Sequence, residues 1–370
     1  MKKIGILSMQ RIYNYGSFLQ AYALKKMIED LGYNEIIFVD YHVGKPLIDK
    51  NNGSTLAKVL DTIKLKVSFK NKIEYLMYKK HYGKKYLPLL GITNQYVYNP
   101  RLDLLIIGSD EVFNCVQSNT NVGFSPELFG YNNKAKVVAS YAASFGNTTF
   151  EKLENYKVSD QVQRGLINNF DYLSVRDNNS ALILHKMGID SYIQNVDPVL
   201  VYDYMNSKIV ETSEINVKEK YLLLYGYTGR FSLAECEVIS NYAKENGLKI
   251  YCIGGLQHYC DKFIDCTPFE VLNYFKNAES IITDTFHGTI MSIINKKRFV
   301  TIIRKNGYGN SEKLTTLLEK LNLSSRKVEI KNDSLRKKLS EKINYQDIDE
   351  ILTKERDKST KYLQKIFSNI

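Results

Sequence analysis

The chain has 370 residues, of which 44% are hydrophobic and 25% are charged. This length and composition exclude a disordered chain and a single small core, and they predict a folded protein of two domains. The 51 Lys and Arg residues against 40 Asp and Glu residues give a formal net charge of +11, which favours anionic partners such as phosphorylated small molecules, nucleic acid or an acidic membrane face. No nucleic-acid-binding motif accompanies the charge, so we expect no nucleic acid among the partners.

The N-terminus and the cysteines bear on the cellular compartment. Residues 1–7 already have the pattern of a strand with two lysines before it, and the sequence contains neither a signal peptide nor an apolar run long enough to span a bilayer. Five cysteines at irregular positions do not form a disulfide framework in a chain this long. We therefore expect a cytoplasmic protein.

In the first half of the chain, short apolar runs alternate with segments of helical periodicity, which is the pattern of parallel βα units. A helix is predicted after the first strand, because apolar residues recur at spacings of three and four from Ala21 to Leu31, and Gly32 is expected to end it. The strands of this half are predicted at Ile4–Leu7, Ile36–Val39, Leu104–Ile107, Val137–Tyr141 and Tyr172–Val175.

A second series of apolar runs begins after a polar stretch, Asp203–Lys220, which is the best candidate for a linker. The last part of the chain is mostly helical and ends in a predicted helix at Ile348–Phe367. The sequence thus predicts an α/β protein with two doubly wound domains, residues 1–202 and 221–325, followed by C-terminal helices in residues 326–370. Strands of the second domain are predicted at Tyr221–Tyr225, Ile250–Ile253, Ser280–Thr283 and Phe299–Ile303, and helices at Leu233–Asn246, Pro268–Asn277 and Thr289–Asn295.

A basic helical insertion interrupts the first domain at about residues 45–100. Between Lys45 and Lys85, eleven lysines and three acidic residues give a local charge of +8. Apolar residues between Leu56 and Met77 indicate amphipathic helices within it. Two interpretations remain open, a contact with a membrane surface or lipid phosphate and an ordinary solvated helical excursion.

In open parallel sheets, ligands bind outside the carboxyl ends of the strands. The first strand is followed by Asn14-Tyr15-Gly16-Ser17, where glycine permits close backbone approach and the N–H groups of a helix start attract anions. Alternatively, Ser17 is the helix N-cap. The segment lacks the G-x-G-x-x-G pattern, so we do not expect a dinucleotide site.

Three further strand ends of the first domain carry candidate residues. Ser109 and Asp110 follow a glycine at the end of the third strand, as substrate contacts or as a capping turn. Ser144 follows the next strand among small residues that permit close approach. Arg176 can bind a carboxylate or phosphate with two hydrogen bonds, or form a salt bridge to Asp177 or to the other domain.

In the second domain, one strand end combines a histidine with a glycine and hydroxyl groups. The strand that ends at Thr283 leads into Asp284-Thr285-Phe286-His287-Gly288-Thr289, and an apolar helix is expected to start there. An imidazole in this position can act as a general acid or base, or donate to a phosphate beside the helix N-terminus. His258 lies near cysteines without the spacing of a zinc site, so no metal is expected.

These motifs resemble those of the polysaccharide pyruvyl transferase family, in the family's order and over residues 1 to about 325. The resemblance implies two Rossmann-like domains that face each other across a cleft, as in GT-B glycosyltransferases. It implies phosphoenolpyruvate as the donor, a sugar or lipid-linked oligosaccharide as the acceptor, and a pyruvyl ketal on two sugar hydroxyls as the product during cell-surface polysaccharide synthesis. The motifs are residues 14–17 with Leu19–Leu24, Ile106–Asn114, Ser174–Asp177 with Ser180, Asp197–Leu200 and Thr283–Thr289.

The resemblance also implies roles for two residues. Arg176 matches the family arginine that holds the donor's carboxylate or phosphate, and His287 matches the histidine proposed as acid and base. The chain departs from the family at Thr285, where better-studied members carry an arginine. One cationic contact to the donor is therefore absent or is supplied elsewhere, with Lys313, Arg304 and Arg230 as candidates.

Other functions stay open at this point. One is a GT-B-type glycosyltransferase that uses a nucleotide sugar, and another is a non-catalytic binding protein of a polysaccharide assembly system. For pyruvyl transfer we expect no cofactor besides the donor substrate. The expected location is cytoplasmic, with peripheral contact at the inner face of the membrane as an open alternative.

Overall fold

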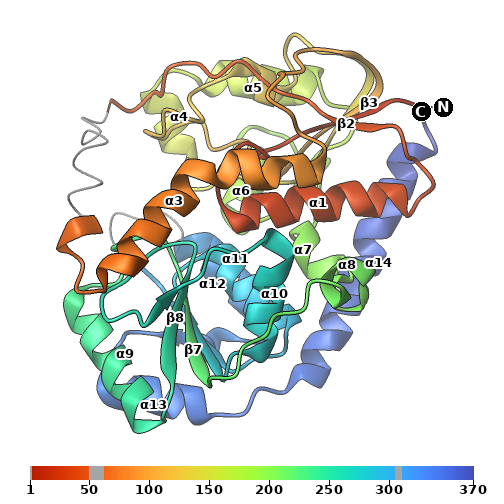
Figure 1. The fold of residues 1–370 in the computed structure, drawn as a ribbon. Coiled ribbons are helices and arrows are strands. Elements are labelled where there is room, and N and C mark those ends of the chain that lie inside the picture. Colours follow the sequence, from red (N-terminus) through yellow and green to blue (C-terminus); the bar gives the residue numbers. More distant parts are fainter. Residues whose placement is uncertain (1, 50–61, 305–310) are drawn as a thin grey trace.

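The computed structural model describes residues 2–49, 62–304 and 311–370, which form two parallel sheets with helices packed on them (Figure 1). Within these residues each sheet has six strands, in the orders β2-β1-β3-β4-β5-β6 and β12-β11-β10-β7-β8-β9. In each sheet, successive strands are added toward one edge and then toward the other. The reversal point lies between β1 and β3 in the first sheet and between β7 and β10 in the second. This is doubly wound topology, and the predicted fold class is confirmed.

The strands predicted from apolar runs are present, most of them with slightly different ends. The run at Tyr172–Val175 gives a shorter strand, and three strands of two residues at or near the sheet edges were not predicted because they contain no apolar run. The strands are β1 Ile4–Leu7, β2 Ile36–Phe38, β3 Arg101–Asp110, β4 Lys134–Ala143, β5 Ser174–Val175, β6 Ile193–Gln194, β7 Tyr221–Tyr225, β8 Lys249–Ile253, β9 Lys262–Phe263, β10 Ser280–Thr283, β11 Phe299–Ile302 and β12 Lys327–Val328.

Several helix boundaries differ from the predictions, and two of the differences have a clear position in the sequence. The first helix ends at Glu29, before Gly32, and the helix predicted to start at Thr289 begins at Phe286, because the Thr285 side chain caps it. The helices are α1 Tyr15–Glu29, α3 Phe69–Tyr86, α4 Phe150–Asn155, α5 Ser159–Asn168, α6 Asn178–Lys186, α7 Pro198–Val201, α8 Lys208–Glu211, α9 Leu233–Glu245, α10 Pro268–Asn277, α11 Phe286–Ile294, α12 Ser311–Lys320, α13 Asn332–Ser340 and α14 Tyr345–Phe367.

The segment predicted as a linker contains α8 and separates the strands of the two sheets. Strands β1 to β6 lie within residues 4–194, and β7 to β12 lie within residues 221–328. The domain boundaries themselves stay a prediction. All five cysteines lie within the described ranges and are buried with free thiols.

Helix α3 belongs to the basic insertion of the first domain but packs against the second domain. The side chain of Asn71 donates to the carbonyls of Cys260 and Asp261 at 3.1 and 3.2 Å, and accepts from the backbone N–H of Phe263 at 3.1 Å. Tyr78 is buried in the same contact, against the ring of Phe263. One face of the insertion is therefore part of the core rather than a solvated excursion. The predicted amphipathic residues up to Leu60 lie outside the described ranges.

Two other helices join the halves of the molecule. Phe18 and Tyr22 of α1 pack on Phe269 of α10, with ring centroids 5.6 and 4.9 Å apart. Helix α14 returns from the second domain to the first (Figure 1), where the hydroxyl of Tyr362 donates to the carbonyl of Ser140 at 2.7 Å. These contacts hold the two halves of the molecule together.

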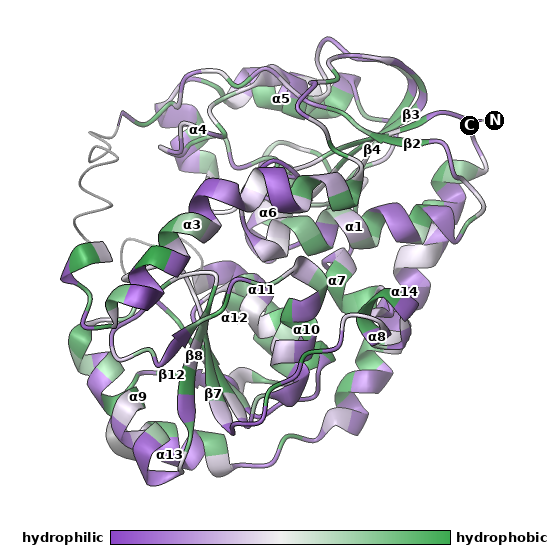
Figure 2. Cartoon of the chain, viewed as in Figure 1, coloured by the Kyte–Doolittle hydropathy of each residue, from purple (hydrophilic) through white to green (hydrophobic). Residues whose placement is uncertain are grey.

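Hydrophilic and hydrophobic residues are interleaved along the long helices α3 and α14 (Figure 2). Over the described ranges, no helix combines the length and the apolar character needed for a bilayer crossing.

Candidate functional site

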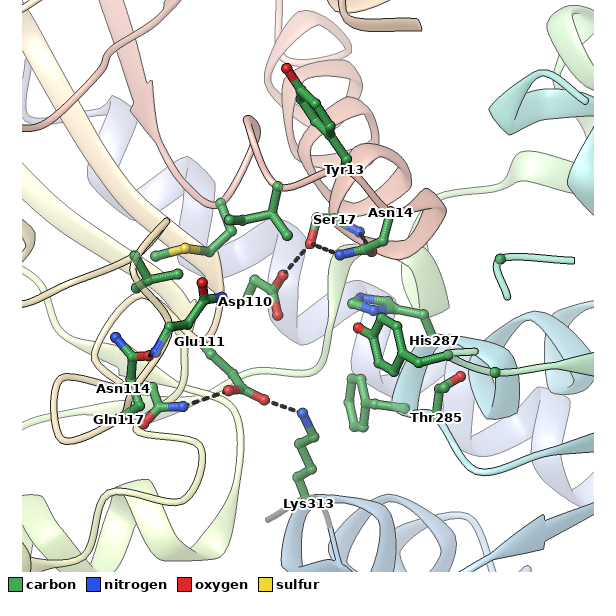
Figure 3. Close-up of a pocket in the computed structure, with 18 of the residues that line it drawn as sticks. Tyr13, Asn14, Ser17, Asp110, Glu111, Asn114, Gln117, Thr285, His287 and Lys313 are labelled. Carbon is green, nitrogen blue, oxygen red and sulfur yellow. Dashed lines mark hydrogen bonds and ion pairs between the residues drawn. The ribbon is translucent and has the colours of Figure 1, made fainter. Parts of the chain in front are cut away.

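A cavity of about 370 Å³ lies between the carboxyl edges of the two sheets (Figure 3). Its walls come mainly from segments that follow β1, β3, β7 and β10, the four strands beside the two reversal points. Parallel sheets bind ligands at such points. The predicted arrangement of two Rossmann-like domains facing across a cleft, as in the GT-B fold, is therefore confirmed. The polar lining residues nearest these strands are Asn14, Ser17, Asp110, Glu111, Tyr227, Arg230, Thr285 and His287.

The wall after β1 is the first turn of α1. Asn14 caps this helix, because its side chain accepts from the backbone N–H of Ser17 at 2.7 Å. The alternative that Ser17 is the N-cap is wrong. The Ser17 hydroxyl instead donates to Oδ2 of Asp110 at 2.9 Å and joins two predicted site residues. Tyr15 points into the core, where its hydroxyl donates to the carbonyl of Cys266 at 2.9 Å.

His287 lies in the first turn of α11, on the opposite wall, with 12% of its side chain exposed. Its Nε2 atom lies 3.4 Å from Oδ2 of Asp197. On the other side of the ring, a Cβ atom at Gly16 would lie 2.2 Å from Nδ1. Gly16 therefore has no side chain for a steric reason, since only glycine leaves room for the imidazole between α1 and Asp197.

Asp197 is the most important site residue to which the sequence analysis assigned no role. It follows β6, is fully buried, and its Oδ2 atom also accepts from Nη1 of Arg176 at 2.7 Å. Burial alone would raise the pKa of this carboxyl group, but the imidazole of His287 and the guanidinium of Arg176 outweigh burial and lower the pKa to about 2. One carboxylate oxygen thus holds the two predicted catalytic residues together.

Arg176 lies behind the wall of the cavity. Its guanidinium is buried and lies 4.3 Å from the ring centroid of Phe286, which itself lines the cavity. The ion pair predicted as one alternative, with Asp177, is wrong. Asp177 caps α6 by accepting from the backbone N–H of Ser180 at 2.9 Å, and Arg176 pairs with Asp197 instead.

The three cations suggested as substitutes for the missing arginine are found around the cavity. Lys313 of α12 lines it and forms an ion pair across the cleft with Glu111. Burial favours a raised pKa for Glu111, but Lys313 and Arg176 outweigh it and lower the pKa to about 2. Arg230 also lines the cavity.

Arg304 lies farther from the cavity than Arg230, which lines it. Both guanidinium groups contact Oδ2 of the buried Asp284, at 2.8 Å from Arg230 Nε and 3.3 Å from Arg304 Nε. Burial raises the pKa of Asp284, although the two arginines oppose this effect. Arg304 also binds Glu235 at 2.6 Å. Asp284 therefore orients Arg230 toward the cavity and is a supporting residue.

The remaining predicted residues hold the walls in place. The hydroxyl of Ser109 lies 3.5 Å from Oδ2 of Asp197, and the hydroxyl of Ser144 donates to Asp177. Thr289 donates to the carbonyl of Thr285 at 3.0 Å. A Cβ atom at Gly288 would lie 2.2 Å from the hydroxyl oxygen of Thr283. Their predicted contact with substrate stays untested.

Thr285 itself faces the cavity at the start of α11. Its hydroxyl accepts from the backbone N–H of Gly288 at 3.0 Å, so it serves as the helix cap. In the described part of the chain, no group of three or more His, Cys, Asp or Glu side chains is placed to hold a metal ion. That no cofactor is needed stays a prediction.

Apart from Asn114, which ends the motif Ile106–Asn114, the sequence analysis did not identify the uncharged wall of the cavity. It lies in the loops after β3 and β4, which carry no regular pattern that distinguishes lining residues from other loop residues. Its members are Asn114, Gln117, Ser118, Asn119 and Asn147.

A family model described as "Polysaccharide pyruvyl transferase" matches residues 14–306. None of the curated proteins compared with the chain matches it.

Solved structures with similar folds share little sequence with this chain. UDP-GlcNAc 2-epimerase from Methanocaldococcus jannaschii, in complex with UDP-GlcNAc and UDP, is 14% identical, with 95% of this chain and 99% of that chain covered and a TM-score of 0.46. UDP-N-acetylglucosamine 2-epimerase from Rickettsia bellii is 11% identical, with 100% and 96% covered and a TM-score of 0.49. Arabidopsis thaliana UGT89C1, complexed with UDP-L-rhamnose, is 10% identical, with 100% and 99% covered and a TM-score of 0.48.

Proposed function

Because the chain belongs to the polysaccharide pyruvyl transferase family, we propose that it transfers the pyruvyl group of phosphoenolpyruvate to two hydroxyls of a sugar and forms a ketal. The acceptor is a sugar or a lipid-linked oligosaccharide of cell-surface polysaccharide synthesis. The observation that carries the proposal is the contact of His287 with the buried carboxylate of Asp197 at the wall of the interdomain cavity.

The charges around the cavity support an anionic donor. Arg230 and Lys313 line the cavity, and the first turn of α11 directs its backbone N–H groups toward the same region. Phosphoenolpyruvate carries a carboxylate and a phosphate, so it offers one anionic group to each of two cations. Arg230 and Lys313 then take the place of the arginine that family members carry at the position of Thr285.

His287 supplies the acid and base chemistry of the proposed reaction. The protonated imidazole gives its proton to the methylene carbon of the donor, which leaves an oxocarbenium centre at the neighbouring carbon. The first sugar hydroxyl adds there, a carbon–oxygen bond forms, and its proton returns to the imidazole. Positioned proton transfer of this kind accelerates a reaction by about two to four orders of magnitude.

The second half of the reaction closes the ketal. The bond between the central carbon and the phosphate oxygen breaks, and inorganic phosphate leaves with the bonding electron pair. The second hydroxyl then bonds to the same carbon, and its proton goes to the departing phosphate. One donor and one sugar give one ketal and one phosphate. Closure of the two domains around the cavity excludes water, which otherwise captures the cation.

Asp197 and Arg176 position the histidine in this scheme. The carboxylate of Asp197 holds the imidazole through its contact with Nε2, and Arg176 fixes the carboxylate from the other side. The family resemblance gives Arg176 a direct contact with the donor. Such a contact requires the ring of Phe286, which covers the guanidinium, to turn aside when the donor binds.

The test is to mix the purified protein with phosphoenolpyruvate and a panel of oligosaccharides. We expect phosphate release together with a product heavier by one pyruvyl ketal, and both of these at least about a hundredfold slower with His287→Ala. Transfer of a sugar from a nucleotide sugar, without any reaction of phosphoenolpyruvate, would overturn the proposal. Donor binding without turnover on any acceptor would favour a binding protein instead.

A further inference from the structure

The outward face of α3 carries an apolar stripe. Phe69, Ile73, Leu76 and Met77 recur at spacings of four, three and one, which places them on one side of the helix. Their exposed fractions are 77%, 45%, 37% and 48%. The opposite side, with Tyr78 at its centre, is buried. Helix α3 therefore exposes large apolar side chains on the side opposite to its buried face.

Lysines continue and flank this stripe. Lys80 and Lys84 follow Leu76 at spacings of four and continue the stripe along the same side of the helix. Lys70 is the sequence neighbour of Phe69. Residues 62–86 contain eight lysines and one acidic residue, Glu74. Exposed apolar side chains surrounded by lysines are suited to bind a partner whose interior is apolar and whose surface layer is negatively charged.

We propose that the exposed face of α3 docks on an anionic lipid bilayer, with Phe69, Ile73, Leu76 and Met77 inserted between headgroups and the lysines on lipid phosphates. Charge complementarity selects this occupant, because the stripe is bordered almost entirely by cations. An interface with a second copy of this basic chain would bring lysines against lysines. In this proposal the protein docks on the cytoplasmic leaflet, where anionic lipids concentrate.

The location of α3 links this surface to the cavity. Lys79, which lies between the exposed and the buried faces of the helix, lines the cavity wall. Gly83 of α3 packs on the ring of Tyr13, which lines the same wall. Docking through α3 therefore places the cavity at the edge of the bilayer. If the proposed function holds, on which this step rests, a lipid-linked acceptor can reach the cavity while its lipid stays in the membrane.

The experiment measures co-sedimentation of the full chain with vesicles of phosphatidylcholine, with and without phosphatidylglycerol. We expect binding to the anionic vesicles only, weakened by salt. The double variants Phe69→Ser/Met77→Ser and Lys70→Glu/Lys80→Glu should each lower the partition coefficient at least about tenfold.

Matched controls change the same residue types elsewhere on the surface. Ile167→Ser/Leu182→Ser removes two apolar side chains that are 53% and 52% exposed on α5 and α6, and it should bind the vesicles like the wild type. Lys337→Glu/Lys361→Glu, on α13 and α14, makes the same charge change as the α3 variant and should weaken binding much less.

Equal binding to neutral and anionic vesicles, wild-type binding by both α3 variants, or a solution dimer that covers Phe69 would each overturn the proposal. The test is separate from catalysis, because the α3 variants should release phosphate from phosphoenolpyruvate with a soluble acceptor at the wild-type rate. Vesicle binding without any pyruvyl transfer would leave the docking surface in place and remove only the proposed function.

Discussion

Nε2 of His287 lies 3.4 Å from Oδ2 of Asp197, and this contact joins the two domains at the cavity. The imidazole comes from the first turn of α11 and the carboxylate from the segment after β6. The first proposed step consumes a protonated imidazole, and the buried carboxylate of Asp197 holds this ring at the cavity wall.

The first prediction concerns His287→Ala. Removing the imidazole deletes the proposed acid and base, so kcat for phosphate release should fall by about two to four orders of magnitude. The KM for phosphoenolpyruvate should change little, because Arg230 and Lys313 remain. Steady-state assays of phosphate release measure both kcat and the KM for phosphoenolpyruvate. A variant that keeps near wild-type kcat would remove His287 from the mechanism.

The second prediction concerns Asp197→Asn, which removes the ion pair of the buried Arg176 guanidinium at 2.7 Å and leaves it the longer ion pair with Asp110 at 3.6 Å. Loss of one member of a buried ion pair costs about 3 to 5 kcal/mol of unfolding free energy, so the melting temperature at neutral pH should fall by several degrees. Asp190→Asn, at an exposed carboxylate that pairs with the exposed His185 at 3.0 Å, is the matched control and should change the melting temperature little.

The pH dependence of this loss has a definite sign. The pKa of Asp197 is about 2, below its ordinary value of 3.8, so its charge stabilises the fold above pH 3.8 and ceases to do so as the pH falls through about 2. The difference in melting temperature between wild type and Asp197→Asn should therefore be constant near neutral pH and shrink between these two values. Calorimetry across this range measures it. A difference that grows on acidification would contradict the assignment.

The sequence predicted the sheets and most of the cavity wall, but not how the site is held together. Apolar runs indicated β1, β3, β7 and β10, and the rule for open parallel sheets then identified the loops that carry Ser17, Asp110 and His287. The role of Asp197 depends on a contact between residues 90 positions apart in the chain, which periodicity does not report. For the same reason, the burial of Arg176 beneath Phe286 could not be predicted from a strand-end position alone.

The third prediction uses the contact between Gly16 and His287. In Gly16→Ala the new methyl group would lie 2.2 Å from Nδ1, so the imidazole must move, and kcat should fall although no polar group is lost. The double variant Gly16→Ala/His287→Gly removes the conflict, including the contact of the new methyl group with Cβ of residue 287 at 2.6 Å. It should be at least as stable as His287→Gly, because alanine favours a helical backbone more than glycine does. A cycle of melting temperatures over the four proteins measures the coupling, and its absence would show that the two residues do not compete for space.

The last prediction concerns the cations at the cavity wall. If Arg230 and Lys313 bind the donor's anionic groups, Lys313→Ala should raise the KM for phosphoenolpyruvate about tenfold or more, since hydrogen bonds to charged groups are worth roughly 1.5 to 3 kcal/mol. Lys313→Arg keeps the charge and should recover part of the affinity.

Lys313 also neutralises Glu111, whose pKa of about 2 should rise in the alanine variant. The KM should therefore depend on pH more strongly in Lys313→Ala than in the wild type at mildly acidic pH, where a protonated Glu111 repels the donor less. A purely structural role for Lys313 would lower stability and leave the KM and its pH dependence unchanged. Donor titrations followed by phosphate release, repeated with Lys320→Ala as a control on the same helix, distinguish the two outcomes.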